Sequence, residues 1–231
     1  MKSALILYSG GIDSTTSLYW ARDRFDQISL LTFDYGQRHR IEVRAASELP
    51  GRLGIPQKVL TVDLTQIGGS ALTDAGIRLP EHTTIEEIGD GLPLTYVPFR
   101  NGIFLSLGAA WAEVIETRDI VCGFNIIDSP NYPDARQAFV SAMEEAINTG
   151  SRAAFESSRF TLHAPFIGKT KSEIIKAGLA LGADYSHSVS CYAGKEIPCS
   201  KCSACLMRQR AWQEAGEEDH LITRLKKEGR I

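Results

Sequence analysis

The sequence predicts an α/β protein with an open parallel sheet that carries helices on both faces. Short apolar runs alternate with longer stretches of helical periodicity, and this alternation is typical of β-α-β units. A turn rich in glycine and hydroxyl residues directly follows the first apolar run, at the edge where sheets of this kind bind ligands. The five predicted strands are residues 3–8, 28–33, 59–64, 120–124 and 160–164.

Each strand is justified by an apolar run, because parallel strands buried on both faces lose the alternation of half-exposed strands. The segments between the runs have the spacing of amphipathic helices. A further charged helix is expected near the C-terminus. The five predicted helices in the body of the chain are residues 14–24, 41–53, 101–116, 134–149 and 171–181.

Residues 66–95 fit neither pattern. They combine glycines and prolines with mixed polarity and have no clear period. Long segments of this kind inside a compact domain are often either lids over a binding site or disordered segments. We therefore expect residues 66–95 to become ordered over bound substrate.

Composition limits the class of protein. The chain has 231 residues, a net charge of −3 and 43% hydrophobic residues, enough to bury a large core. It has no apolar run of about 18 residues and no basic-then-apolar start, so we expect a cytoplasmic protein without a membrane partner. Because no long basic block is present, we expect no nucleic-acid partner.

The turn at residues 9–14, Ser-Gly-Gly-Ile-Asp-Ser, has the chemistry of a polyphosphate site. Glycines allow the backbone to approach an anion, and the following helix presents free N–H groups at its positive end. Ser9 and Ser14 add hydroxyl donors, and Asp13 can help to hold Mg²⁺ between phosphate oxygens. The alternative is a tight turn without a ligand.

Other phosphate loops do not fit the chain. Gly168-Lys169-Thr170 resembles the end of a Walker A motif, but His163 stands where its first glycine is required. The turn instead resembles the pyrophosphate-binding loop (PP-loop) of ATP pyrophosphatases, which have an adenine nucleotide alpha hydrolase-like fold. That resemblance implies ATP and Mg²⁺, with Asp13 and Ser14 catalytic. The nucleotide-binding residues it implies are Tyr8, Ser9, Gly10, Gly11, Ile12, Asp13, Ser14, Thr15, Thr16, Ser17 and Leu18.

Four cysteines near the C-terminus follow the pattern C-x7-C-x2-C-x2-C. Four thiolates within fifteen residues suit tetrahedral zinc, and a site closed by four protein ligands is structural rather than catalytic. A redox-active dithiol and an iron–sulfur cluster remain alternatives. We expect a nucleotide-binding domain over residues 1–185 and a zinc-binding region over 186–231, packed on the same domain. The expected zinc ligands are Cys191, Cys199, Cys202 and Cys205.

Taken together, the motifs resemble the 7-cyano-7-deazaguanine synthase family of the queuosine pathway, nearly from end to end. The turn combined with the cysteines and the further motifs points to one family rather than to the PP-loop superfamily alone. Besides residues 8–18 and the cysteines, the matching stretches are 33–40 (FDYGQRHR), 69–74 (GSALTD), 97–101 (VPFRN), 132–134 (YPD) with Arg136, 170–174 (TKSEI) and 190–192 (SCY).

This resemblance implies an AMP-forming carbon–nitrogen ligase and, as we expect, a homodimer. The family converts 7-carboxy-7-deazaguanine and ammonia to the nitrile with ATP, through an acyl-adenylate and an amide. Lys171 is a candidate catalytic contact to phosphate, with a solvated helix lysine as the alternative. For the substrate residues the alternatives are surface ion pairs or a helix cap. The substrate-binding residues implied are Arg100, Asn101, Asp128, Tyr132, Asp134 and Arg136.

The chain departs from the family at residues 129–136, SPNYPDAR. Pro130 and Asn131 stand where the family has serine and glycine, and Ala135 replaces a cysteine. Proline removes a backbone donor, so the pocket is altered. One alternative is therefore a relative that adenylates the same carboxylate and joins it to an amine on a protein. Another alternative is a tRNA-modifying PP-loop enzyme.

Overall fold

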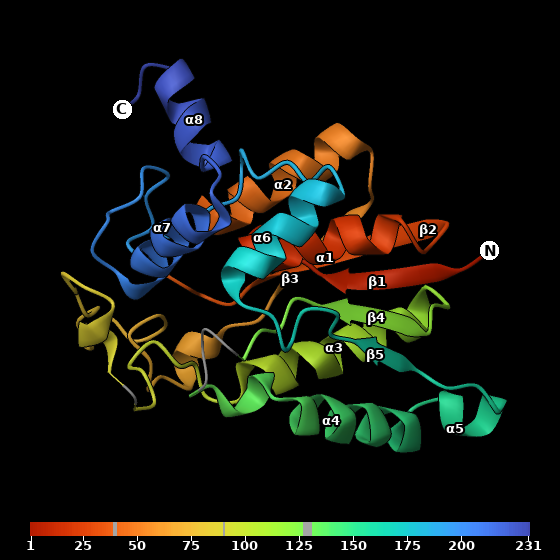
Figure 1. Ribbon diagram of the computed structural model, residues 1–231. Helices are drawn as coiled ribbons and strands as arrows, with labels where there is room; N and C mark the ends of the chain where they lie inside the picture. The colour runs from red at the N-terminus through yellow and green to blue at the C-terminus, as the bar shows by residue number, and fades with distance from the viewer. Residues whose placement is uncertain (39–40, 90, 127–130) are drawn as a thin grey trace.

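A computed structural model describes residues 1–38, 41–89, 91–126 and 131–231. Its strands form one five-stranded sheet in the order β3-β2-β1-β4-β5, with every neighbouring pair parallel (Figure 1). This confirms the predicted fold class. The strands are β1 (Ser3–Leu7), β2 (Gln27–Asp34), β3 (Gln57–Thr61), β4 (Asp119–Cys122) and β5 (Thr161–His163).

Helices connect the strands and continue after β5. Three short 3-10 helices are η1 (Leu64–Gln66), η2 (Glu86–Ile88) and η3 (Pro133–Ala135). The α-helices in the described residues are α1 (Ile12–Arg22), α2 (Ile41–Leu53), α3 (Arg100–Val114), α4 (Gln137–Gly150), α5 (Ala153–Glu156), α6 (Lys171–Ala180), α7 (Ser203–Ala215) and α8 (His220–Lys227). None of the helices in these residues is long and apolar enough to cross a bilayer.

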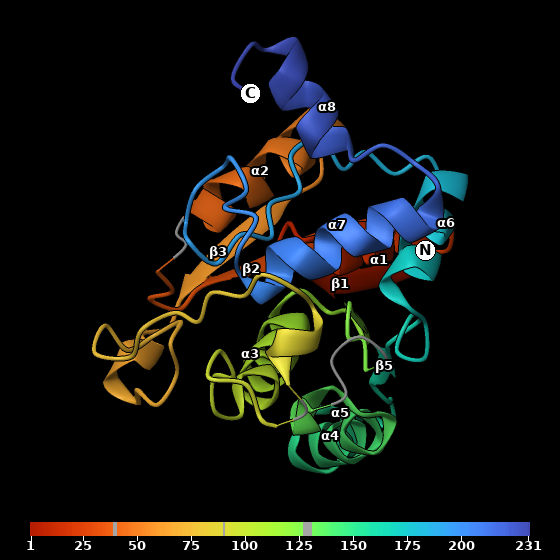
Figure 2. The same cartoon turned by 60° about the vertical axis from the view of Figure 1, so that its left-hand side comes forward.

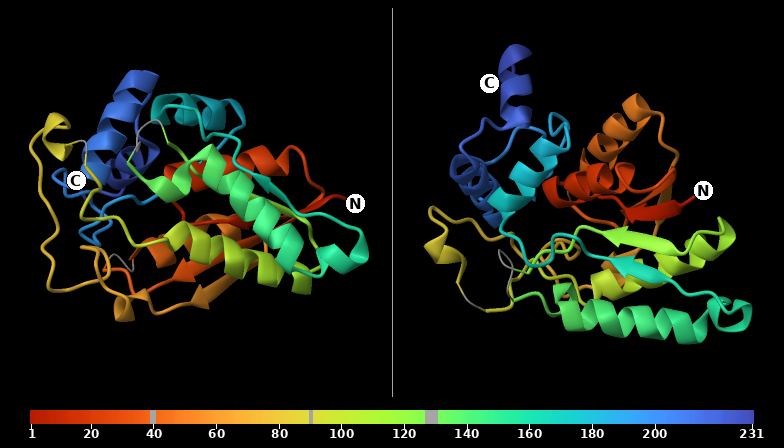
Figure 3. Two further views of the ribbon diagram at one scale, coloured as in Figure 1. Left: turned by 90° about the horizontal axis from the view of Figure 1, so that it is seen from below. Right: turned by 45° about the vertical axis from the view of Figure 1, so that its right-hand side comes forward.

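The central strand β1 divides the core into two layers. Ala4 and Ile6 belong to a cluster that includes residues of α1, α2, α6 and α7. Leu5 and Leu7 belong to a second cluster with residues of α3 and α4. Figure 3 shows the two sets of helices on opposite faces of the sheet. The strand is apolar throughout because successive side chains enter different layers.

Several element boundaries differ from the prediction for local reasons. Helix α1 begins at Ile12 rather than at residue 14, so half of the glycine-rich turn is already helical. Strand β3 covers Gln57–Thr61 because η1 starts soon afterwards, at Leu64. The predicted helix at 134–149 begins as α4 only at Gln137, because Pro133 opens a separate 3-10 turn.

The segment predicted as a lid lies at the carboxyl ends of the strands (Figures 1 and 2). It is tied to itself by the N–H of Ala71, which donates to Leu94 O over 2.7 Å. It is tied to the C-terminal region by the N–H of His82, which donates to Lys201 O over 2.8 Å. The segment therefore forms a wall between the sheet edge and the cysteine-rich region, and its ordering by substrate stays a prediction.

The C-terminal region contains two helices, where the sequence indicated one charged helix. Trp212 of α7 is buried in the core layer that also contains α1 and α6, and its ring meets Tyr185 edge to face at 5.5 Å. Between α7 and α8, Arg208 forms a buried ion pair with Asp219, with Nη2 to Oδ1 at 2.7 Å. Asp219 also caps α8 by accepting from the N–H of Leu221.

Candidate active site

The turn after β1 is held in shape by its own hydroxyl groups. The Ser14 hydroxyl donates to Gly11 O over 3.1 Å and lies 3.1 Å from the Ser9 hydroxyl. The N–H of Ser9 donates to the same Ser14 oxygen over 3.3 Å. These contacts curl the turn around the N-terminus of α1, whose free N–H groups favour an anion.

Two glycines allow close packing around this turn. Gly10 has a φ of 78°, and a Cβ at this position would lie 2.9 Å from Ala46 Cα in α2. Gly123 follows β4, and a Cβ there would lie 2.8 Å from the backbone nitrogen of Ser14. Since real Cβ contacts are longer than this, a side chain at either position would displace the turn.

Lys171 reaches the turn from the first residue of α6. Its Nζ lies 2.9 Å from Oδ1 and 2.8 Å from Oδ2 of Asp13, and both side chains are about four-fifths buried. A capping box fixes the start of α6: Thr170 accepts from the N–H of Glu173, and Glu173 accepts from that of Thr170. The lysine is therefore a partly buried cation at the turn, not the solvated helix lysine that the sequence left as an alternative.

The expected nucleotide-binding residues divide into two groups. Thr16 hydrogen-bonds the hydroxyl of Tyr185 over 2.6 Å, the Ser17 hydroxyl donates to Asp13 O, and Leu18 is fully buried in the core. A cavity opens beside the turn, and these three residues, with Gly10 and Thr15, do not line it. The expected nucleotide-binding residues that do line this cavity are Tyr8, Ser9, Gly11, Ile12, Asp13 and Ser14.

The cavity has a volume of about 320 Å³ and extends from the turn to the start of α3. There the Arg100 guanidinium lies 3.4 Å from the Tyr35 hydroxyl and within 6 Å of the Tyr35 and Phe104 ring centres. Within the described part of the chain, no carboxylate forms an ion pair with Arg100. The guanidinium thus has donors for an anionic ligand that faces it across the cavity.

Tyr132 and Asn101 line the same end of the cavity. The Tyr132 hydroxyl lies 3.2 Å from that of Thr95, and its ring meets the Tyr96 ring edge to face at 5.9 Å. Tyr132 therefore presents an aromatic surface held from two sides. Such a surface suits a flat heterocycle.

Asp134 does not line the cavity and does not cap the helix that follows it. Its Oδ2 accepts from the backbone N–H of Asn101 over 3.0 Å, and the Asn101 side chain donates to Asp134 O. Asp134 therefore caps α3, the helix that begins with Arg100. Its Oδ1 is buried and has no hydrogen-bond partner in the described residues.

The other expected substrate residues lie apart from the cavity or cannot be described. Arg136 is exposed at the N-terminus of α4 and does not line the cavity. Asp128 lies outside the described residues. The 129–136 departure is described from Asn131 onward, and Ala135 lines the cavity where the family has a cysteine.

Sequence reasoning assigned no role to several cavity residues. Tyr35 and Gln37 follow β2, and the Gln37 side chain accepts from the N–H of Tyr35 over 2.7 Å. Burial raises the pKa of the Tyr35 phenol, which keeps it a neutral donor. Their position after the strand beside β1 was the signal in the sequence. Glu42, Tyr192 and Arg208 also line the cavity.

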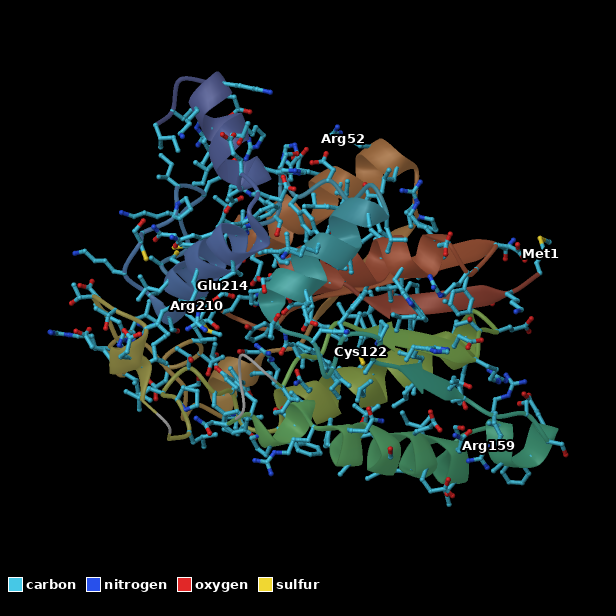
Figure 4. All side chains as sticks on the ribbon, in the orientation of Figure 1. Met1, Arg52, Cys122, Arg159, Arg210 and Glu214 are labelled. Atoms are coloured by element: carbon cyan, nitrogen blue, oxygen red, sulfur yellow. The ribbon has the colours of Figure 1, made fainter. Side chains whose placement is uncertain are left out.

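A second cavity of about 320 Å³ adjoins the first. It lies between η2 and the face of α7 that carries Arg210 and Glu214 (Figure 4). Arg210 pairs with Glu214 at 2.7 Å. The wall common to both cavities consists of Thr95, Tyr132, Lys171, Tyr192 and Met207.

The four predicted cysteine ligands converge in the structure. Their Sγ atoms all lie within 4.8 Å of one another, and Cys199 Sγ is 3.9 Å from Cys205 Sγ. A tetrahedral metal with bonds of about 2.3 Å to sulfur needs sulfur–sulfur distances of about 3.8 Å. The residues therefore fit a metal ion. Hydrogen bonds from the thiols of Cys202 and Cys205 lower the pKa of Cys191, whereas the pKa values of Cys202 and Cys205 are raised.

Comparisons with known proteins agree with this geometry. A family model described as queuosine biosynthesis protein QueC matches residues 3–216. A 7-cyano-7-deazaguanine synthase of Pseudomonas syringae is 45% identical over 221 residues, which cover 94% of each chain. A synthase of the same name from Methylococcus capsulatus is 43% identical and covers 95% of this chain and 97% of its own.

Among solved structures, the NMN synthetase of Francisella tularensis has a TM-score of 0.50 and 12% identity. The match covers 96% of this chain and 81% of the other. At this level of identity the similarity concerns the fold alone.

Proposed function

Because the chain belongs to the QueC family of queuosine biosynthesis proteins, we propose that it is an enzyme that makes 7-cyano-7-deazaguanine. The substrates are 7-carboxy-7-deazaguanine, ammonia and ATP. The observation that carries this proposal is the single cavity that joins the turn at residues 9–14 to Arg100 and Tyr132. In this cavity, a carboxylate bound near Arg100 and Tyr132 can reach a nucleotide bound at the turn.

The first step is adenylation of the carboxylate. One carboxylate oxygen attacks the α-phosphorus of ATP, and the bond to pyrophosphate breaks. Ser9, Ser14 and the N-terminus of α1 receive the pyrophosphate, whose negative charge grows as it leaves. Mg²⁺, when bound with ATP, neutralises phosphate charge, and Asp13 is the residue that would hold it.

Lys171 changes partner in this proposal. The lysine and Asp13 neutralise each other in the structure, 2.8 Å apart. With Mg²⁺ and ATP bound, Asp13 would hold the metal and Lys171 would pair with a phosphate oxygen instead. The cation therefore compensates the aspartate before ATP binds and the phosphates afterwards.

Nitrogen enters in the second half of the reaction. Ammonia attacks the acyl carbon, AMP leaves and a proton is released, which gives the amide. A second ATP then activates the amide oxygen with release of pyrophosphate, and loss of AMP and of both amide protons gives the nitrile. The net products per substrate are two AMP and two pyrophosphate, and the carboxyl group loses both of its oxygens to AMP.

The bound metal in this proposal is structural zinc at the four cysteines. All four positions are thiolates of the chain, so the ion has no open coordination site and takes no part in the reaction. The expected homodimer and cytoplasmic location stay predictions.

Incubation with 7-carboxy-7-deazaguanine, ammonium and ATP tests the function. We expect the nitrile, together with AMP and pyrophosphate in equal amounts. A control without the deazaguanine should release almost no pyrophosphate. Formation of ADP and inorganic phosphate in place of AMP would contradict the adenylation chemistry as a whole.

A second candidate is amide formation with an amine of another protein. The second cavity supports it, because this cavity adjoins the first along five residues and is also lined by Asn131, where the family has glycine. A nucleophile larger than ammonia could approach along it. The same incubation separates the candidates, since a nitrile product excludes an enzyme that stops at the amide.

A further inference from the structure

We propose that Tyr192 binds the substrate carboxyl group beside Arg100, by donating a hydrogen bond from its phenol. This inference rests on the proposed function and adds a residue to it. Tyr192 follows the first cysteine of the metal cluster and is absent from the residues that the sequence pattern singled out as binding substrate.

The position of Tyr192 favours contact with the reacting group. It lines the first cavity together with the turn at residues 9–14 and lines the second cavity together with η2 and α7. It therefore lies on the boundary between the cavities. A carboxylate at this boundary can meet ATP from the side of the turn and ammonia from the other side.

The part of the first cavity that Tyr192 lines offers several donors for an anion, and it also contains the carboxylate of Glu42. Arg100, Tyr132 and Tyr35 line the first cavity together with Tyr192, so a guanidinium and several phenols share this cavity. Arg100 offers only donors, and a carboxylate offers two oxygens with about four acceptor sites. Arg100 alone leaves some of these sites unfilled, and the Tyr192 hydroxyl is a further donor of the right kind.

Tyr192 is also held rigidly. Tyr192 packs against the buried cysteine cluster and also against the apolar layer around α3. The preceding residue, Cys191, is a predicted metal ligand. The phenol is consequently positioned before substrate binds, and a preorganised donor loses little entropy when it forms its hydrogen bond.

A specific chemical role follows from this geometry. Only one carboxylate oxygen attacks ATP, and the other becomes the carbonyl oxygen of the acyl-adenylate. Tyr192 and Arg100 bind the oxygen that remains. When ammonia adds to the acyl carbon, the C=O electron pair moves onto that same oxygen, and the two donors stabilise the negative charge.

Binding of two ligands distinguishes this role from a merely structural one. Calorimetry would compare 7-carboxy-7-deazaguanine with 7-deazaguanine, which lacks the carboxyl group, on wild type, Tyr192→Phe and Tyr19→Phe. Tyr19 is a matched control because it is a buried tyrosine of α1 outside both cavities. Melting temperature and bound zinc would be measured on each variant.

We expect Tyr192→Phe to bind the carboxylated ligand about tenfold more weakly, the typical value of a hydrogen bond to a charged group. Its affinity for 7-deazaguanine, its zinc content and its melting temperature should equal those of wild type, and Tyr19→Phe should match wild type throughout. An equal loss for both ligands, or no loss for either, would overturn the assignment. If wild type binds neither ligand, the proposed function falls as well.

Discussion

The Ser14 hydroxyl joins both arms of the turn after β1, since it donates to Gly11 O and accepts from the N–H of Ser9. We predict that Ser14→Ala lowers ATP turnover by about 10²–10³-fold, the typical cost of losing one preorganised donor. Pyrophosphate release in the presence of 7-carboxy-7-deazaguanine measures this effect.

Ser17→Ala is the matched control for Ser14→Ala. Ser17 lies one turn further along α1, and its hydroxyl donates to Asp13 O without lining the cavity. The same atom is removed from the same helix, but the turnover should stay within about threefold of wild type. Equal losses in the two variants would show that α1, rather than the Ser14 hydroxyl, is what matters.

Phe99 and Gly102 depend on each other. Phe99 has a φ of 52°, which costs a residue with a side chain about 1–2 kcal/mol, and a Cβ on Gly102 would lie 2.3 Å from the Phe99 ring. Gly102→Ala alone should lower the free energy of unfolding by about 1–3 kcal/mol, because the ring blocks the added methyl group.

In a Phe99→Gly background, the effect of Gly102→Ala on the free energy of unfolding changes sign. The ring is then gone, and Gly102→Ala should raise the free energy of unfolding by about 1 kcal/mol through helix propensity. Urea denaturation of the four proteins gives the coupling energy. Additive effects of the two substitutions would refute the mutual dependence.

Single residues also mark the limit of sequence reasoning. The sequence alone identified the loop residues Ser9, Asp13 and Ser14 correctly as neighbours on one turn, because the pattern is local. It could not predict that Asp134 caps α3, 33 positions earlier in the chain. A cap across such a distance depends on how two helices pack, and no local pattern carries that information.

At the next scale, strand β4 positions helix α1 through Gly123. A Cβ at Gly123 would lie 2.9 Å from the carbonyl carbon of Asp13, so Gly123→Ala must push the start of α1 away from the sheet. A shift of about 1 Å at a catalytic group can lower the rate about 10²-fold. We therefore predict that Gly123→Ala lowers the rate of pyrophosphate release by about 10²-fold. Gly150→Ala, in α4 with open space around the new methyl group, should leave the rate unchanged.

The cysteine cluster includes the first turn of α7. Cys202 precedes this helix and Cys205 lies within it, so loss of a bound metal would release the N-terminal end of the helix, one face of which lines the second cavity. We predict that Cys205→Ala binds no zinc and melts several degrees below wild type. Cys122→Ala removes a buried thiol outside the cluster and should keep one zinc per chain, as measured by atomic emission.

Elements were predictable where a periodic pattern is long. The strands and the helices α2, α3 and α6 were expected within a few residues, because each has an apolar face or run of its own. The short helices η2, η3 and α5 were not expected. Three or four residues carry no measurable period, and their conformation follows from the elements that flank them.

The whole molecule responds to acid through its carboxyl groups. Among the described residues, hydrogen bonds lower the pKa of seven carboxyl groups. Asp184 is one of them: burial raises its pKa, but hydrogen bonds from the side chain and the backbone of Ser186 outweigh this and lower it. A carboxyl group whose pKa is lower in the folded state stabilises the protein at every pH above its unfolded-state pKa, which is 3.8 or 4.5 here. That stability is lost as the pH falls through the folded-state pKa.

His187 adds to this acid response at higher pH. Burial is the main cause that lowers its pKa below 6.5, so the unfolded chain binds a proton that the folded chain releases. We predict a free energy of unfolding that declines gently below pH 6.5 and steeply below pH 4.5, as measured by urea denaturation at each pH. His187→Gln should remove the gentle part alone. A stability that is constant down to pH 3 would contradict both assignments.

The fold class was predictable because alternating patterns extend over most of the chain. The strand order β3-β2-β1-β4-β5 was not predicted, because the sequence pattern does not show which strands are neighbours. The division at residues 185 and 186 stays a prediction. Trp212 is buried in one layer with residues of α1 and α6, so the C-terminal region shares its core with the rest of the chain.

The contact between Asp13 and Lys171 joins positions 158 residues apart. On the ribosome, the turn at residues 9–14 is therefore made long before its cationic partner exists. A chain that ends before α6 lacks the lysine that neutralises Asp13 in the folded protein. The charge-compensated form of the turn therefore requires the chain to extend as far as α6.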